Sequence, residues 1–158
     1  MISRRCWLGF KRVRAEIAER AETAEESELE RIDEISAAVI DQAIKIHREL
    51  GPGLFESVYE TTLAGRLAQA GFRVARQVAV PVMFDVRQFE AALRVDIRVD
   101  DCLVLEIKAV EQLNKAHARQ LLNYLRLLKQ PVGLLLNFSG ATMKEGIRRL
   151  VNDYRPGS

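Results

Sequence analysis

The order of elements along this chain constrains its fold more than any other feature: three strand-like stretches come first, then a helix, then a largely apolar stretch. The three stretches, at about 72–86, 91–99 and 103–110, are rich in Val, Ile and Leu and partly alternate in polarity, which predicts an antiparallel meander. A helix is expected at about 113–129. The stretch 132–138 is apolar on both faces, which is typical of a covered, central strand. A helical crossover would make this last strand parallel to a neighbour, so we expect a mixed sheet.

Helical periodicity completes the predicted order. Apolar residues at steps of three and four indicate a helix from about 29 to 50, which Gly51-Pro52-Gly53 ends. A second helix is expected at about 54–70, before Gly71, and a short amphipathic helix at 142–151. The expected fold class is therefore α/β, in its α+β form with a mixed sheet.

Length and charge pattern predict one domain with an N-terminal appendage. The chain has 158 residues and is 48% hydrophobic, which suits a single core. Residues 1–28 carry a basic block and then an acidic block with few apolar residues, so we interpret them as a flexible or helical appendage. Residues 29–158 are expected to form the folded domain.

Other sequence features exclude several classes of protein. The formal charge of +2 gives no general case for binding polyanions. Cys6 and Cys102 form no CxxC pair and have no histidines at zinc-ligand spacing, so neither a disulfide framework nor a zinc site is expected. The apolar runs fall well short of the roughly 20 residues that cross a bilayer, and no secretory signal pattern is present. We therefore expect a cytoplasmic protein without membrane contact.

Two strands carry polar side chains that alternation places on one face. In LRVDIRV, Asp96 alternates with aliphatic residues, and in LVLEIKA the side chains of Glu106 and Lys108 share the face opposite the aliphatic ones. If both aliphatic faces join one core, a three-residue turn at 100–102 sets Val99 opposite Leu103. Asp96 would then stand opposite Glu106, within cross-strand contact distance.

Two adjacent carboxylates beside an ammonium group favour a divalent cation. Without one, Asp96 and Glu106 would repel each other, and oxygen-only ligation suits Mg²⁺ or Mn²⁺. The cation would acidify a water, and Lys108 could position that water or stabilise charge on a phosphate. The alternative is a solvated strand face, with Asp96 paired to Arg94 or Arg98 and Glu106 to Lys108.

Two motifs resemble those of a known family. Asp96 followed by Glu106-Ile107-Lys108 resembles the D…(D/E)-x-K signature of the PD-(D/E)XK nucleases. In GPGLFESVYE, the spacing of Gly, Glu and Tyr is similar to the G-x-x-E-x-x-Y pattern that names the GxxExxY family within that superfamily. The resemblance covers about 32–151.

The resemblance implies a restriction-endonuclease-like αβββαβ core with an extra N-terminal helix. It implies that Asp96, Glu106 and the main-chain carbonyl of Ile107 bind the metal, while Lys108 serves the attacking water. Glu56 matches a first-helix glutamate that completes such sites. We expect it on the inward stripe of Leu63 and Leu67, where an unpaired carboxylate would be costly. The alternative is a first-turn glutamate favoured by the helix dipole.

A further pair lies on the later helix. Gln120 and Tyr124 are four residues apart, hence on one helix face, and resemble the Q-x-x-x-Y motif by which RecB-type nucleases support the active site and contact nucleic acid. Two alternatives are equally favoured, namely core packing of Tyr124 with its hydroxyl at the edge and a capped, buried amide for Gln120. Gly53 and Tyr59 are expected to be architectural, and His47 and His117 structural.

The sequence therefore predicts a divalent-metal-dependent nuclease that hydrolyses phosphodiester bonds, with DNA favoured over RNA. The alternative is a catalytically silent module that keeps the fold and binds nucleic acid or a protein partner. The undamaged set of acidic and lysine positions favours the enzyme. Whether a homodimer spans a duplex is left open.

Overall fold

The computed structural model describes residues 4–152, with side chains described at 11–83, 85–89 and 93–152. The chain divides into two compact units, residues 1–34 and 35–158. The outer ends of the two expected domains, residues 1–3 and 153–158, lie outside the described residues. The expected domain boundary near residue 28 stays a prediction.

Helix α1 runs from Arg4 to Leu50 and begins well before the expected start near residue 29. Its part in the first unit is rich in Ala, Glu and Arg, which are strong helix formers. An ion pair between Arg12 and Glu16, 3.2 Å apart at a spacing of four residues, supports this part further. Every described side chain from 11 to 31 is exposed.

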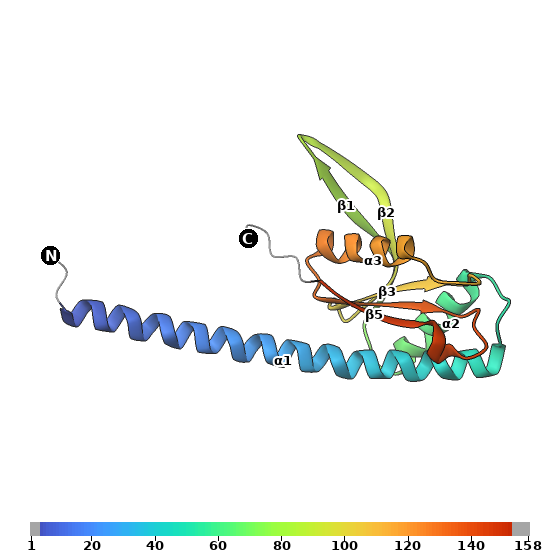
Figure 1. The fold of residues 1–158 in the computed structure, drawn as a ribbon, viewed down its shortest axis with the longest axis horizontal. Coiled ribbons are helices and arrows are strands. Elements are labelled where there is room, and N and C mark those ends of the chain that lie inside the picture. Colours follow the sequence, from blue (N-terminus) through green and yellow to red (C-terminus); the bar gives the residue numbers. More distant parts are fainter. Residues whose placement is uncertain (1–3, 153–158) are drawn as a thin grey trace. The chain divides into compact units, whose positions relative to one another are not determined.

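A mixed sheet forms the centre of the second unit (Figure 1). Its described strands are β1 (Val74–Phe84), β2 (Arg87–Val99), β3 (Leu103–Lys108), β4 (Val132–Asn137) and β5 (Ile147–Val151). They are ordered β1-β2-β3-β4-β5. β3 and β4 pair in parallel, and the other neighbours are antiparallel. The predicted meander and the predicted parallel crossover strand are both confirmed.

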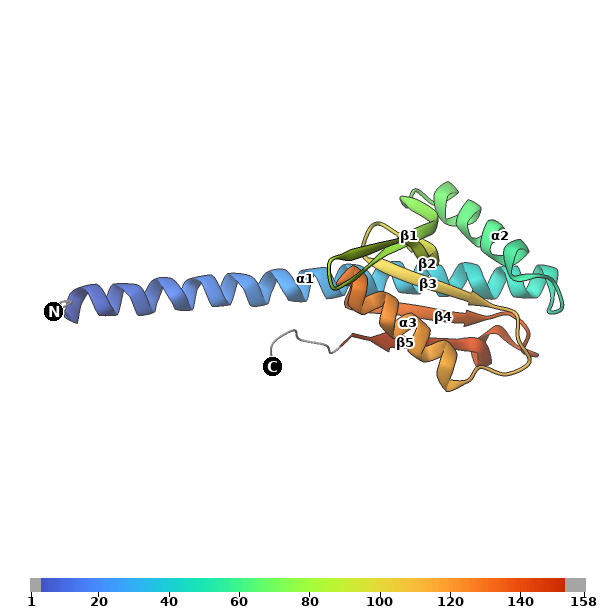
Figure 2. The same ribbon diagram turned by 90° about the horizontal axis from the view of Figure 1, so that it is seen from above.

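Helices α2 (Glu56–Gln69) and α3 (Lys115–Leu128) pack on this sheet (Figures 1 and 2). α2 contacts β1, β2 and β3, whereas α3 contacts β1, β4 and β5. Leu121 and Leu125 of α3 lie directly over Gly133 of β4, where a Cβ would come within 3.0 Å of the Leu121 side chain. The glycine in this strand therefore permits a close helix approach. All six residues of β4 are buried, as expected for a central strand.

The turn between α1 and α2 is held by Tyr59. Its hydroxyl donates to the Gly51 carbonyl at 2.7 Å and accepts from the Leu54 amide at 3.1 Å. Its ring stacks on Phe138, with centroids 4.4 Å apart. Gly53 has φ +100°, which disfavours a side chain. The expected architectural roles of Tyr59 and Gly53 are confirmed.

The predicted closing helix at 142–151 is wrong. Met143–Gly146 form one 3₁₀ turn, and the next five residues form β5, antiparallel to β4. Without β5, the backbone N–H and C=O groups on the second edge of buried β4 would be unpaired. The free-energy cost of leaving them unpaired exceeds the small gain from forming a weakly amphipathic helix. Gly146 also lies so close to the Asn137 carbonyl that a Cβ there would clash.

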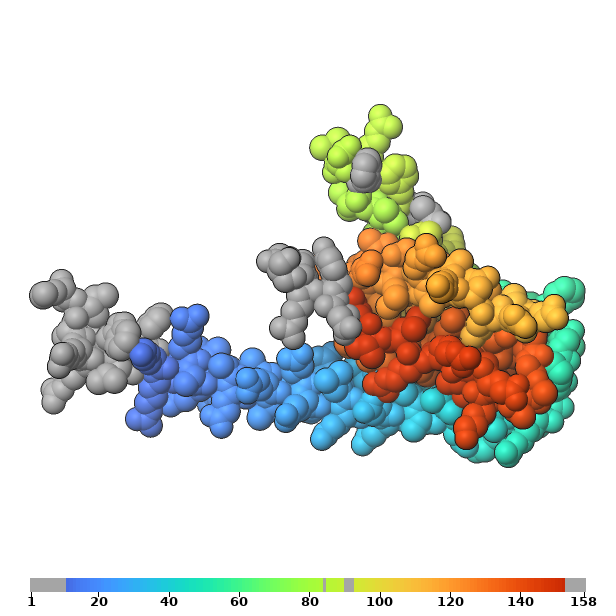
Figure 3. Space-filling view, viewed as in Figure 1, coloured from blue at the N-terminus to red at the C-terminus, as the bar shows by residue number. Residues whose placement is uncertain are grey.

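The β1–β2 hairpin stands out from the surface of the second unit (Figures 1 and 3). Its tip carries exposed apolar side chains, including those of Met83 and Val86. In the part of the chain that the structure describes, no helix is both long enough and apolar enough to cross a bilayer.

Candidate functional site

The turn between β2 and β3 sets the positions of the two predicted carboxylates. Val99 pairs with Leu103 and Ile97 with Leu105, so the expected register and three-residue turn are confirmed. Asp96 lies one residue before Ile97, and Glu106 lies one residue after Leu105, so the two carboxylates occupy the next positions away from the turn. Glu106 is almost fully buried, with 2% of its surface exposed, while Asp96 is partly buried.

Hydrogen bonds tie this group together. The Ile107 amide donates to Asp96 Oδ2 at 2.7 Å, and Lys108 Nζ donates to Glu106 Oε1 at 2.9 Å. The N–H and C=O of a strand residue point to the same strand edge, so the Ile107 carbonyl is also directed toward the β2 side. Glu106 Oε2 is buried and has no hydrogen-bond partner among the described residues. Such an oxygen is costly unless a further group binds it.

The electrostatics of the site disfavour two bare carboxylates. Burial, and then the charge of Asp96, raise the pKa of Glu106 to about 7, against the opposing effect of Lys108. Burial also raises the pKa of Asp96, although its hydrogen bond from Ile107 acts in the opposite direction. Burial disfavours the charged form of Lys108, but the bond to Glu106 and the surrounding carboxylates raise its pKa overall. The site therefore holds excess negative charge.

Glu56 lies elsewhere than expected. It is the first residue of α2 and is exposed, so its predicted inward position beside Leu63 and Leu67 is wrong. Its Oε1 accepts a hydrogen bond from the Ala109 amide at 3.1 Å. Its charge still contributes to raising the pKa of Glu106, after burial and the charge of Asp96.

Glu60, one turn after Glu56, takes the inward position. It is 6% exposed and forms an ion pair with Arg76, with Nε and Oε1 3.0 Å apart. Gln77 Nε2 lies 3.0 Å from Glu60 Oε2 and 3.4 Å from Asp96 Oδ1. Sequence reasoning missed all three of these contacts. One signal was available, because Glu60 precedes Leu63 by three residues and so shares the buried stripe of α2.

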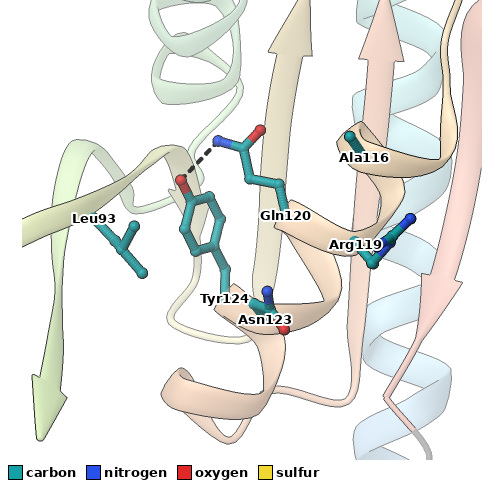
Figure 4. Close-up of a pocket in the computed structure, with 6 residues that line it drawn as sticks. All are labelled: Leu93, Ala116, Arg119, Gln120, Asn123 and Tyr124. Carbon is teal, nitrogen blue, oxygen red and sulfur yellow. Dashed lines mark hydrogen bonds between the residues drawn. The ribbon is translucent and has the colours of Figure 1, made fainter. Parts of the chain in front are cut away.

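Gln120 and Tyr124 meet on α3, as their spacing predicts (Figure 4). Gln120 Nε2 donates to the Tyr124 hydroxyl at 2.8 Å. Burial raises the pKa of Tyr124, the bond from Gln120 opposes this, and the charge of Glu106 adds to it. The tyrosine hydroxyl therefore lies within electrostatic range of the carboxylates.

A pocket of about 350 Å³ opens beside this pair. In Figure 4, Leu93 from β2 faces Tyr124 across the pocket, and side chains of α3 form its other wall. The lining residues are Leu93, Ala116, Arg119, Gln120, Asn123 and Tyr124.

The two histidines have structural partners. His47 Nε2 lies 2.9 Å from the Gly140 carbonyl oxygen. His117 belongs to the capping box of α3, where its Nδ1 accepts from the Asn114 amide at 3.2 Å. Both contacts agree with the structural roles expected for these residues.

The sequence model of the PD-(D/E)XK nuclease superfamily matches residues 33–150. The chain belongs to the PD-(D/E)XK nuclease superfamily. The expected fold class is confirmed, since α2, β1–β3, α3 and β4 follow the αβββαβ order, with α1 before them. The superfamily implies a nucleic-acid substrate, and its nucleases usually use divalent metals. No curated protein and no solved structure matches the chain.

The side chains of this PD-(D/E)XK superfamily member fit a hard divalent cation in their donor chemistry. All candidate ligand atoms are oxygens, and one of them, Glu106 Oε2, is buried without a partner among the described residues. In the arrangement described, however, no three Asp, Glu, His or Cys side chains converge closely enough to hold a metal. Lys108 and the Ala109 amide occupy oxygens of Glu106 and Glu56 instead. Binding would therefore require these side chains to turn toward the ion.

Proposed function

We propose that this protein hydrolyses phosphodiester bonds in nucleic acid, DNA in preference to RNA, with Mg²⁺ or Mn²⁺ as its cofactor. The observation that carries the proposal is Oε2 of Glu106, on the strand after Asp96, which is buried and has no hydrogen-bond partner in the described part of the chain. In a superfamily of metal-dependent nucleases, a cation is the simplest partner for that oxygen. We assign the chain to the GxxExxY family within this superfamily, on the resemblance of the motif at 53–59.

Each proposed site residue has a separate task. Asp96, Glu106, the Ile107 carbonyl and Glu56 would hold the cation. The bound cation would lower the pKa of a water and neutralise charge on the scissile phosphate. Lys108, which is largely buried beside Glu106, would hold the attacking water or donate to a phosphate oxygen. This ammonium keeps its charge, because the neighbouring carboxylates raise its pKa.

Gln120 and Tyr124 are proposed to contact the nucleic acid next to this site. Tyr124 is largely buried, so it offers its hydroxyl rather than its ring, while Gln120 lies beside the pocket lined by Arg119 and Asn123. Arg119 is exposed and would supply a positive charge for the phosphate backbone. A cytoplasmic location remains an expectation from the sequence, and the sequence leaves open whether a homodimer spans a duplex.

The second candidate function is a catalytically silent module that binds nucleic acid or a protein partner. The contact between Lys108 and Glu106 favours it, because a lysine that neutralises the carboxylate can replace a metal. So does the lack of three converging metal-ligating side chains among the described residues. The two functions differ in one measurable property, which is cleavage.

Cleavage assays on the purified chain test the proposal. Single-stranded DNA, duplex DNA and RNA are incubated with Mg²⁺, Mn²⁺ or EDTA, alongside Glu106→Ala and Asp96→Ala. Wild type is expected to cut DNA only with metal, and both variants to lose activity at least 100-fold. Asp41→Asn is the matched control, since it removes an exposed carboxylate of the surface pair with Lys45 and should leave cleavage unchanged. Binding without cleavage on all substrates would favour the silent module.

A further inference from the structure

One residue of β1 departs from ordinary strand geometry directly beside the candidate site. Gln77 has φ +50°, in the left-handed region that residues other than glycine seldom adopt. Its neighbours pair regularly, Arg76 with Ile97 and Val78 with Val95, so Gln77 stands opposite Asp96 in the ladder. A non-glycine residue held in this way costs of order 1–3 kcal/mol and persists only where its surroundings fix it.

The side-chain amide of Gln77 contacts two carboxylates, and its backbone carbonyl accepts a hydrogen bond from Arg94 Nη1 at 3.4 Å. Gln77 Nε2 lies 3.0 Å from Glu60 Oε2 and 3.4 Å from Asp96 Oδ1. Glu60 is itself anchored, because it is buried and its other oxygen pairs with Arg76 Nε at 3.0 Å. Arg76 Nη2 in turn donates to Thr61 Oγ1 at 2.8 Å. Gln77 therefore joins Asp96 to a fixed point on α2.

We propose that Gln77 is a positioning residue, which orients the Asp96 carboxylate for binding a divalent cation. The Ile107 amide already donates to Asp96 Oδ2 at 2.7 Å, and the Gln77 amide donates to the opposite oxygen. Contacts on both oxygens fix the plane of the carboxylate while leaving further lone pairs for the ion. This inference rests on the proposed function, because it takes Asp96 as a metal ligand.

An amide suits this position better than a charged group. The NH₂ group has two donor hydrogens, so it can serve Glu60 and Asp96 together. It adds no positive charge, so the negative charge of Asp96 stays available to the cation, whereas a lysine would compete with it. Partners that orient ligating carboxylates typically change metal affinity 10–100-fold when they are removed.

The backbone strain of Gln77 allows a test that separates positioning from folding. Gln77→Gly removes the hydrogen bond to the buried Glu60 but also relieves the left-handed backbone, and because these effects oppose each other the melting temperature in EDTA is expected to stay close to that of wild type. Mn²⁺ affinity, measured by isothermal titration calorimetry, is expected to fall about 10–100-fold. Gln77→Asn, which tolerates the same backbone but is one methylene too short to bridge both carboxylates, is expected to show the same loss.

Lys129→Gly is the matched control. Lys129 is exposed at the end of α3, with φ +54°, and belongs to no part of the proposed site. Its replacement relieves comparable strain and should leave Mn²⁺ affinity unchanged. In the Gln77 variants, DNA cleavage at limiting Mn²⁺ is expected to fall and to recover in excess Mn²⁺, which a general folding defect would not produce.

Two results would overturn the inference, and they differ. Wild-type Mn²⁺ affinity in both Gln77 variants would remove the positioning role and leave the proposed nuclease intact. Wild type that neither binds Mn²⁺ nor cleaves nucleic acid would remove the proposed function and this inference with it.

Discussion

Replacing Glu106 with glutamine should stabilise the metal-free protein in a pH-dependent way. The native carboxyl keeps its proton up to about pH 7, whereas an ordinary glutamate loses it near 4.5. Between these values the native state binds more protons than the unfolded state, so the free energy of unfolding falls as pH rises and then levels off. At 1.36 kcal/mol per pKa unit, the interval corresponds to roughly 3 kcal/mol. A glutamine at position 106 cannot titrate, so the free energy of unfolding of the Glu106→Gln variant does not fall in this way as pH rises.

Urea unfolding of both proteins in EDTA, followed by circular dichroism from pH 5 to pH 8, measures the effect. The free energy of unfolding of Glu106→Gln relative to wild type is expected to rise by about 2–3 kcal/mol across this range. Mn²⁺ at pH 8 should then stabilise wild type and leave the variant unchanged, because ligand binding to the native state adds stability. A difference that is constant with pH, or that falls as pH rises, would refute the reasoning.

Other residues give further predictions. Lys108→Gln is expected to lower cleavage at saturating Mn²⁺ about 100-fold while keeping near wild-type Mn²⁺ affinity by calorimetry, because its ammonium serves the reaction and not the ion; equal losses in both would contradict this. Tyr59→Phe removes both hydroxyl bonds at the α1–α2 turn, so urea unfolding should show a loss of about 1–2 kcal/mol. Gly146→Ala should cost more than 2 kcal/mol in the same assay, since a Cβ has no room beside the Asn137 carbonyl; an unchanged midpoint would show that β5 can shift.

Alternation in two short strands was enough to predict the register at the site. Because the aliphatic residues beside Asp96 and Glu106 had to reach buried positions, a two-residue turn was excluded and a three-residue turn satisfied both strands, and Val99 does pair with Leu103. Helical periodicity gave the wrong element at 142–151. The residues of β5 form a strand there because they pair with the edge of β4, and a local pattern does not contain that tertiary contact.

The contacts around Gln77 lie beyond what a sequence pattern can show. Its left-handed backbone belongs to a residue type with no special preference for it, and its partner Glu60 is 17 residues away. The position of Glu56 failed for a different reason. Glu56 is the first residue of its helix, and its side chain accepts a hydrogen bond from the Ala109 amide just after β3 and does not follow the buried stripe of the later turns.

β3 has a strand neighbour on each edge, and five of its six residues are buried. Backbone amides of such a strand exchange with solvent only when the whole unit unfolds. Glu106 and Lys108 therefore keep their spacing through local openings elsewhere in the molecule. Changes of substrate preference during evolution would fall instead on the outward β1–β2 hairpin and the exposed side chains of α3, which can vary without disturbing that strand.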